Sequence, residues 1–475
     1  MKSKITSFLF LLVSLTAVSQ TQKEIGTKFD YDEREKDLKV VLVDNYNHYM
    51  SSAINVDASM QSVNKIIIRK FDQKNQLVET FTEEFPYKDV FTLHNYLGSF
   101  ELQNEKLVVL VECYSNKTKK IEVFQVTFDK KTGLFDKKVI AEYTFESLSK
   151  SGATYAMVSQ NKNYIGVVHS KFANKKIAEE NQCVLIDGKT GDLLWKKDVP
   201  FPLLSFTESI VLSDTGKFVF VRTTQETGSQ NVLAIADGNT VENKDFGKED
   251  IKIKKPLVFS VGTNEYLIAF DNYAHGINRG EFGKVLFYDL TAGVVLKNNI
   301  AGSLSDIKDV SKVNFNTLSI QNDEIYLFVD ADFKSGTKPD PTFPNSTFKV
   351  AEYSNGYPSL LIFDLKGNLT KTEDFNVMPF KEPSKSLSVL NVKGNYFLNT
   401  YWRINNSNGF YGGIYRLNNG AVDRNGKMCS FNEPNEEGIV MAKFSNYLPD
   451  AKRLIIAKSY GANKMAFMNV LNIQL

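Results

Sequence analysis

The residues best suited to chemistry lie in the segments that separate predicted strands, and they favour recognition over catalysis. These segments combine guanidinium groups with aromatic rings, which stack on sugars and anchor protein partners. The candidate ligand-binding or partner-binding residues are Arg222, Tyr273, His275, Arg279, Tyr401, Trp402 and Arg403. We therefore predict a binding face and assign no catalytic residue.

Motifs that would indicate an enzyme or a metal site are absent from the sequence. The chain has 4 His and 3 Cys and contains no G-x-S-x-G, H-E-x-x-H or C-x-x-C motif. Asp330 and Asp332 begin like a calcium loop, but Lys334 occupies the third ligand position, so we predict a turn with solvated carboxylates. We expect no metal and no cofactor. A glycoside hydrolase or lyase remains the alternative, because paired carboxylates meet only in space.

The N-terminal segment has the layout of a secretory signal peptide. In residues 1–19, Lys2 and Lys4 precede a short apolar run, and small residues Ala17 and Ser19 stand at the −3 and −1 positions. The run is too short to cross a bilayer, and no other stretch is long enough. We expect a soluble protein of a bacterial envelope, periplasmic or extracellular.

Charge and cysteine content exclude several classes of partner and scaffold. The 57 Lys and Arg residues nearly balance 55 Asp and Glu residues, so nothing favours nucleic acid or an anionic membrane. Three scattered cysteines do not make a disulfide framework. Cys183 lies in the apolar run 183–186, which predicts a buried free thiol.

A repeated hairpin is the main structural signal. An alternating apolar strand ends at an Asp or Asn, a tight turn follows, and a second strand begins; such turns join antiparallel strands. The turns fall roughly 50 to 75 residues apart. Their positions are Asp72, Asp129, Asp187, Asp237, Asp289, Asp364 and Asn418.

A second kind of hairpin alternates with the first and gives four strands per unit. Its turns centre on residues 103–106, 160–163, 213–217, 262–265, 321–324, 393–395 and 449–451. Four strands in roughly fifty residues is typical of a β-propeller blade. We predict an all-β, seven-bladed β-propeller closed by pairing of N- and C-terminal strands. Eight blades is the alternative, because extra strands at 38–43 and 465–473 have no assigned place. Residues 20–37 would be an extension and residues 38–475 a single domain.

One blade resembles a known repeat. Residues 183–196 (CVLIDGKTGDLLWK) resemble the pyrroloquinoline-quinone-type propeller repeat, in which a strand, an Asp, a Thr-Gly turn and a Trp recur. Residues 128–133 and 288–293 match only in the turn. Propellers of this and the WD40-like kind often bind no quinone, so the resemblance implies an architecture and no cofactor. It also implies that Trp195 packs between adjacent blades.

Loop lengths indicate which face recognises a partner. In a blade the connections between second and third strands share one face with those that lead to the next blade. Here the second-to-third connections are the long ones, at 170–182, 222–230, 271–283, 330–357 and 403–412. Backbone free of ladder constraints commonly carries recognition. We expect an exported, non-catalytic monomer that binds a protein or glycan through this long-loop face.

Overall fold

The fold consists almost wholly of antiparallel β-strands. The computed structural model of the chain describes residues 22–32, 34–43, 47–55, 62–85, 92–102, 106–224, 230–245, 253–273, 281–300, 310–321, 323–339, 349–355, 359–374, 387–392, 395–403, 410–418, 421–432, 437–448, 452–461 and 463–471. Within these ranges the one helical element is the 3-10 turn η1 (Leu148–Lys150). The predicted signal peptide at 1–19 lies outside the described residues.

The strands form eight sheets, which follow one another in chain order. The first sheet contains β3 (Glu35–Val43), β4 (His48–Asn55), β5 (Val63–Phe71) and β6 (Leu77–Glu84); the second contains β7 (Thr92–Glu101), β8 (Lys106–Ser115), β9 (Lys120–Asp129) and β10 (Phe135–Thr144). The third contains β11 (Ala153–Val158), β12 (Tyr164–Ser170), β13 (Glu180–Asp187) and β14 (Leu193–Pro200); the fourth contains β15 (Ser205–Leu212), β16 (Phe218–Thr224), β17 (Gln230–Ala236) and β18 (Val241–Asp245).

The second half of the chain repeats this plan. The fifth sheet contains β19 (Ile253–Val261), β20 (Asn264–Tyr273), β21 (Glu281–Asp289) and β22 (Val294–Ile300). The sixth contains β23 (Val310–Gln321), β24 (Glu324–Pro339), β26 (Ser359–Asp364) and β27 (Leu369–Asp374), with β25 (Lys349–Asn355) paired to β24. The seventh contains β28 (Leu387–Val392), β29 (Asn395–Arg403), β30 (Phe410–Asn418) and β31 (Ala421–Asn432). The eighth contains β32 (Ile439–Leu448), β33 (Arg453–Ser459), β34 (Lys464–Leu471) and β1 (Gln22–Ile25), with β2 (Phe29–Asp30) also on β34.

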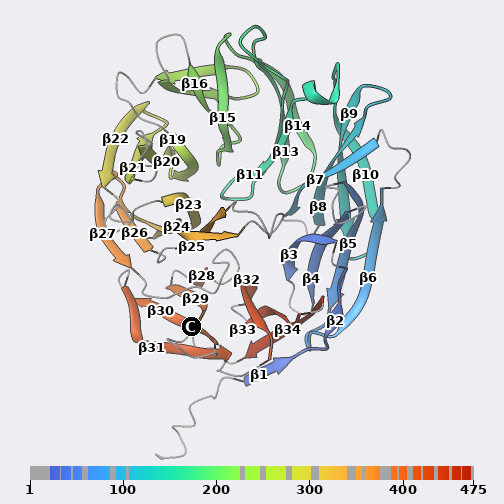
Figure 1. The fold of residues 1–475 in the computed structure, drawn as a ribbon, viewed down its shortest axis with the longest axis vertical. Helices are drawn as coiled ribbons and strands as arrows, with labels where there is room; N and C mark the ends of the chain where they lie inside the picture. Colours follow the sequence, from blue (N-terminus) through green and yellow to red (C-terminus); the bar gives the residue numbers. More distant parts are fainter. Residues whose placement is uncertain are drawn as a thin grey trace, which may run out of the picture.

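The sheets are arranged around a common middle, which is the β-propeller architecture that the repeats predict. The first strand of each sheet contacts the first strand of the next, from β3 and β7 onward to β32, which contacts β3. Figure 1 shows the fourth strands β6, β10, β22, β27 and β31 at the rim. The eight sheets correspond to the eight-blade alternative and not to the first choice of seven. The two strands left unassigned by sequence, near 38–43 and 465–473, are β3 and β34.

The N- and C-terminal strands pair, but differently from the expected division. We expected the first Asp-turn hairpin and the last C-terminal hairpin to be two halves of one sheet. Instead the first hairpin, β5–β6, belongs to its own sheet with β3 and β4. Strand β1 supplies only the outer strand of the eighth sheet, with Gln22 opposite Leu471 and Ile25 opposite Met468. Residues 22–30, predicted as an extension, are therefore part of the last sheet.

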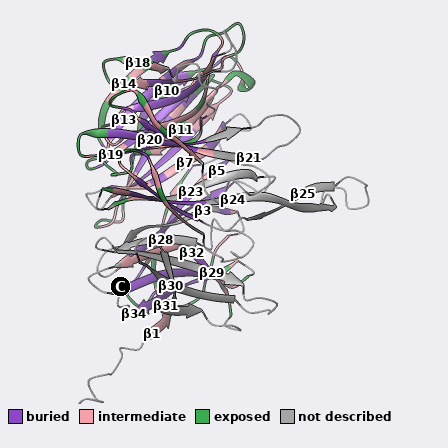
Figure 2. Ribbon diagram, turned by 90° about the vertical axis from the view of Figure 1, so that its left-hand side faces the viewer, coloured by how far each residue is buried: buried purple, intermediate pink, exposed green. Residues whose placement is uncertain are grey.

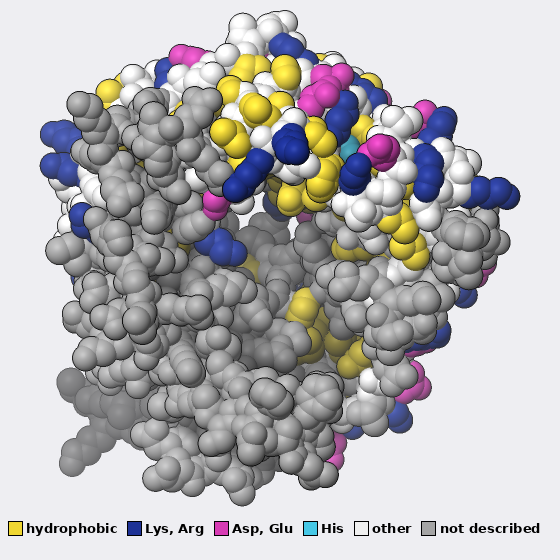
Figure 3. All heavy atoms as spheres, turned by 45° about the horizontal axis from the view of Figure 1, so that its top comes forward, with side chains coloured by type: hydrophobic (Ala, Val, Ile, Leu, Met, Phe, Trp, Pro, Cys, Tyr) yellow, Lys and Arg dark blue, Asp and Glu magenta, His cyan; other side chains and the backbone are white. Residues whose placement is uncertain are grey.

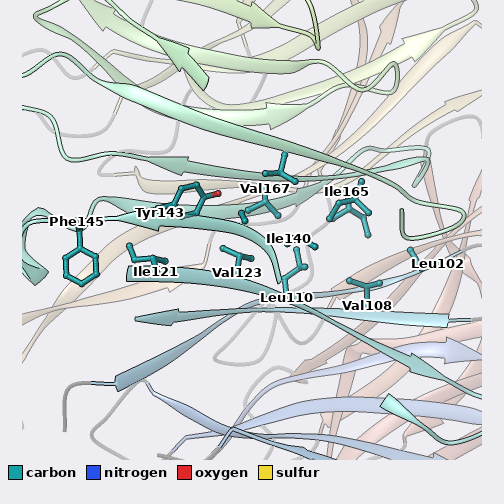
Figure 4. Close-up of a cluster of buried hydrophobic side chains, with 13 residues drawn as sticks. Leu102, Val108, Leu110, Ile121, Val123, Ile140, Tyr143, Phe145, Ile165 and Val167 are labelled. Atoms are coloured by element: carbon teal, nitrogen blue, oxygen red, sulfur yellow. The ribbon is translucent and has the colours of Figure 1, made fainter. Parts of the chain in front are cut away.

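The core lies between sheets, because the middle strands whose side chains the structure describes are covered on both faces. Val108, Leu110 and Val123 of the second sheet pack against Ile165 and Val167 of the third (Figure 4). The intervening residues Leu107 and Val109 pack instead toward the first sheet. This explains why β8 and β12 are apolar runs, whereas outer strands such as β6 and β10 are largely exposed. Figure 2 shows exposed residues mainly in turns and along the margins of the described part.

The recurring aspartates are structural. Each carboxylate accepts hydrogen bonds from backbone N–H groups of its own turn, as Asp187 does from Lys189 (2.8 Å) and Thr190 (2.7 Å). The same contacts are made by Asp72, Asp129, Asp237, Asp289 and Asp364. Backbone N–H groups hold the pKa of Asp187 below its ordinary value. The motif therefore fixes hairpins between third and fourth strands and carries no site chemistry.

Candidate functional site

The predicted site residues that the structure describes lie where second strands end, on the long-loop face. Arg222 is near the end of β16, and Tyr273 is the last residue of β20. Tyr401, Trp402 and Arg403 end β29. His275 and Arg279 lie outside the described residues. The topology therefore places three of the expected segments on one face, as the loop lengths predict.

Arg222 belongs to the interior and not to a binding surface. Its guanidinium donates to the Ser205 carbonyl (2.5 Å) and to Thr207 Oγ1 (2.6 Å). It lies 3.3 Å from the ring centroid of Phe201 and 3.5 Å from a carboxylate oxygen of Glu179. Arg222 is only 2% exposed, and burial lowers its pKa to about 10. The structure therefore places Arg222 beneath the surface, held by groups of the third and fourth sheets.

The Glu179–Arg222 pair organises the long-loop end of the third and fourth sheets. Glu179 accepts hydrogen bonds from the Thr207 backbone N–H (2.7 Å) and from the Asn181 amide (3.0 Å). Asn181, in turn, accepts from Ser170 at the end of β12. A buried ion pair is tolerated when further hydrogen bonds satisfy both groups, and that condition is met here. The network thus fixes how the loop after β12 leaves the sheet.

A second buried polar cluster lies between the second and third sheets at the same end. The Thr154 hydroxyl, on β11, donates to Glu112 of β8 and lies 2.8 Å from His169 Nδ1. Because that hydroxyl has one proton, Nδ1–H of His169 must donate to it. Glu112 also accepts from the Asn95 amide (3.2 Å). The His169 ring stacks on Tyr143, with centroids 4.1 Å apart.

Burial determines the charge states in this cluster. Desolvation raises the pKa of Glu112 and lowers that of His169 to about 4, so His169 is neutral at pH 7. The hydroxyl lies between the carboxylate and the imidazole, so the order differs from a nucleophile–base–orienter triad. Both ionisable groups are buried, at 2% and 1% exposure. The geometry therefore suits a structural network beneath the long-loop face.

Metal-binding groups are not assembled in the part of the chain that the structure describes. No three His, Cys, Asp or Glu side chains there are placed to hold an ion. Asp330 and Asp332, expected in a turn, lie within the long strand β24. In the same described ranges no helix has the length and apolar composition needed to cross a bilayer. Cys183 is fully buried and free, as the sequence predicts.

A surface that the sequence analysis did not predict lies above the two clusters. We name it the belt. It comprises residues 115–120, 145–152, 171–180 and 201–205, which belong to the long-loop face of the second and third sheets. Leu148, Ile177 and Leu203 project from it with 43%, 44% and 43% exposure. Beside the hollow at the middle of the molecule, Figure 3 shows hydrophobic side chains of the described part interspersed with charged ones. The available sequence signal was the aliphatic residues in loops, whereas the predicted site residues are aromatic, imidazole and guanidinium groups.

A long hairpin also emerges on this face. Residues 334–339 of β24 pair only with β25, beyond the last contacts of β24 with β23 and β26. The connection expected as a loop at 330–357 is therefore largely a two-stranded ribbon. This ribbon extends beyond the sheet and adds no strand pairing to β23 or β26.

Trp195 has the packing role implied by the repeat resemblance. It lies on β14 of the third sheet, and its ring meets Phe218 of the fourth sheet edge-on, with centroids 5.5 Å apart. A Cβ added to Gly238 would also lie 3.3 Å from the indole. Trp195 therefore packs between neighbouring sheets.

Comparison with known proteins assigns the chain to no family. No protein-family model matches the chain, and no curated protein sequence matches it. Among solved structures, the Dos1 propeller aligns with a TM-score of 0.47 at 10% identity, covering 94% of each chain. The WD40 domain of SCAP from fission yeast aligns with a TM-score of 0.38 at 10% identity, covering 95% of this chain and 98% of that one. The α-L-arabinanase of Penicillium chrysogenum aligns with a TM-score of 0.34 at 7% identity, covering 65% and 94%.

The sheets and their cyclic order thus define the class. The chain is a β-propeller and is assigned to no specific family.

Proposed function

We propose that this protein is an exported, closed, eight-bladed propeller that acts as a non-catalytic monomer. It would bind a protein or a glycan of the cell envelope through its long-loop face. The observation that carries the proposal is the exposure of Leu148, Ile177 and Leu203 on one side of this face. The three side chains come from successive connections on this face, and apolar surface concentrated on one face marks interaction sites more often than scattered residues do.

The enzymatic alternative rests on Glu112. Its raised pKa is the kind of perturbation that general acids show. Against a catalytic role, the carboxyl is 2% exposed and is held by Thr154 and Asn95. Under our proposal Glu112→Gln leaves partner binding unchanged. A glycosidase or lyase activity in the purified protein that Glu112→Gln abolishes would favour the alternative.

A capture experiment tests the binding function. The purified protein is immobilised, exposed to envelope extract and to a glycan array, and compared with a Leu148→Ser/Ile177→Ser/Leu203→Ser variant. The matched control carries Leu134→Ser/Leu193→Ser/Val294→Ser, three side chains that are more exposed (67%, 48% and 48%) and lie at turns on the opposite face. We expect retained ligands to be lost in the first variant and kept in the control. Ligands kept equally by both variants would refute use of this face.

A further inference from the structure

The belt is one continuous surface, because short contacts tie its four segments together. The backbone N–H of Phe145 donates to the Lys119 carbonyl (3.1 Å), which joins the first two segments. A Cβ built on Gly152 would lie 3.1 Å from the Cα of Lys171, so residues 145–152 pack directly against the third segment, 171–180. The Phe201 N–H donates to the Glu179 carbonyl (2.9 Å), which joins the fourth segment.

The belt carries uncompensated positive charge. Its three carboxylates are each matched by a cation: Glu146 by Lys150 (2.5 Å), Glu180 by Lys171 (2.9 Å) and Glu179 by the buried Arg222. Lys120 is matched by Glu142 of β10 (2.9 Å). Four exposed lysines of the belt's described residues are not matched by a carboxylate in these pairs: Lys117, Lys119, Lys175 and Lys176.

The left-over lysines alternate with the exposed apolar side chains. Ile177 directly follows Lys175 and Lys176, and Leu148 lies in η1, between Phe145 and Gly152, which contact the Lys119 and Lys171 segments. The Glu179–Arg222 network and the Glu112 cluster fix the underlying backbone from below. Leu204, beside Leu203, has φ of 61°, a conformation that bulky residues seldom adopt unless the surroundings enforce it.

From this combination we propose that the belt binds an acidic polypeptide segment of a partner protein, with Leu-like side chains set among Asp or Glu residues. This inference rests on the proposed binding function and names the partner's chemistry. Apolar contact supplies affinity, and the lysines supply orientation and a faster encounter. The belt would be the place where this chain meets that partner.

Phosphate-bearing ligands fit the belt less well. Phosphate sites converge arginine forks or several backbone N–H groups on one point. The belt lysines come from separate loops with Leu148 and Ile177 between them, and the belt's cation neighbour Arg222 is buried. A lipid surface would also need deeper apolar insertion than three half-exposed side chains provide.

The test uses defined probes and the full-length protein. The first probe is a fluorescent synthetic peptide in which pairs of Glu and Leu alternate; the second replaces every Glu with Gln, and the third is a phosphatidylglycerol vesicle. We expect saturable binding of the Glu–Leu peptide that weakens with added salt, and at least about tenfold weaker binding of the Gln peptide. Lys175→Glu/Lys176→Glu should weaken Glu–Leu peptide binding at least about tenfold.

The control variant is Lys131→Glu/Lys189→Glu, which makes the same charge change in turns on the opposite face and should bind like the parent protein. Equal weakening in both variants would mean a general charge effect and overturn the proposal. Binding of vesicles but not of the acidic peptide would replace it by a membrane function. If the Leu148/Ile177/Leu203 variant loses its captured ligand while the acidic peptide fails to bind the parent protein, the face is right and the partner chemistry is wrong.

Discussion

The imidazole of His48 stacks on the ring of Phe71, with centroids 4.9 Å apart and planes inclined by only 11°. Phe467 of the eighth sheet meets the same imidazole edge-on at 4.5 Å. His48 is fully buried, and within the described structure neither ring nitrogen has a hydrogen-bond partner. The boundary between the first and eighth sheets therefore contains a titratable group that the fold can hold only in its neutral form.

Acid should therefore destabilise this boundary. Burial, with a contribution from the Arg453 charge, lowers the pKa of His48 to about 3 from 6.5. Because the folded-state pKa is depressed, the unfolded chain takes up the proton first. Stability falls by about 1.4 kcal/mol per pH unit as pH drops from 6.5 toward the folded-state value. Urea titrations at pH 7 and pH 4.5 should show this loss.

A substitution assigns the acid effect to His48. His48→Phe keeps an aromatic ring between Phe71 and Phe467 but cannot bind a proton, so its stability should fall less between pH 7 and pH 4.5. His169, whose pKa is lowered to about 4, should account for a similar part of the remainder. An unchanged difference in His48→Phe would show that His48 does not titrate on unfolding.

The strands that could be predicted from the sequence are those whose own residues are mostly apolar. The second and third strands of most sheets are apolar runs, and the third strands end in Asp turns, so their order could be predicted. In the first sheet the β5–β6 hairpin and a strand at 38–43 were predicted, but β4 escaped detection, because it buries His48, Ser51 and Ser52 and has no apolar alternation. Strand β1 reads QKEI and has no apolar signal of its own. Its place is determined by the open edge of β34 and not by its own propensity.

The site was less predictable than the fold. Position at the end of a second strand placed Arg222, Tyr273 and Trp402 on the long-loop face, because topology alone determines that. Strand position did not predict whether a side chain is buried. For Arg222, burial depends on Glu179 and Phe201, which flank strands of the third sheet. The belt was equally hidden, since pairing of Glu146 and Glu180 with their lysines is a property of the folded chain.

The pairing of β1 with β34 can be tested by a disulfide. Lys23 lies opposite Val470, and cross-strand Cα atoms at roughly 4.5–5.5 Å are within the range a disulfide spans. Oxidised Lys23→Cys/Val470→Cys should run as a compact species on non-reducing gels and gain up to about 5 kcal/mol of stability. Glu24→Cys/Val470→Cys is the control, because a shift of one residue points the side chain to the other face. Equal cross-linking of both pairs would contradict the register.

The buried Glu35–Arg69 pair should stabilise the first sheet only as a pair. The guanidinium makes two hydrogen bonds to the carboxylate, at 2.6 and 2.7 Å, and Ser52 donates to it as well (2.6 Å). Arg69→Ala leaves the Glu35 charge buried and should cost about 3–5 kcal/mol in urea unfolding. Arg69→Met/Glu35→Leu should recover most of that loss. If the double variant were as unstable as Arg69→Ala, the loss of stability would come from lost packing and not from the unpaired Glu35 charge.

Trp195 should be required for docking of the third sheet on the fourth. Trp195→Ala removes the contact with Phe218 and should cost about 2 kcal/mol, less than for a fully buried Trp because the indole is partly exposed. Leu194→Ala, at a neighbouring position with 46% exposure, should change stability by less than about 0.5 kcal/mol. Differential scanning calorimetry of the two variants makes the comparison. Equal effects would show that the contact between the sheets does not depend on the indole.

Variants of Arg222 can distinguish a structural role from a ligand-binding role at the long-loop face. Arg222→Ala strands the Glu179 carboxylate and removes the cation above Phe201, so we expect a loss of about 3–5 kcal/mol. Arg222→Met/Glu179→Gln, which keeps the volume and removes both charges, should restore much of that stability. At temperatures where it is folded, this double variant should retain the ligands captured by the parent protein, measured by the same capture experiment. If a stable double variant lost those ligands, Arg222 or Glu179 would be needed for ligand binding and not only for stability.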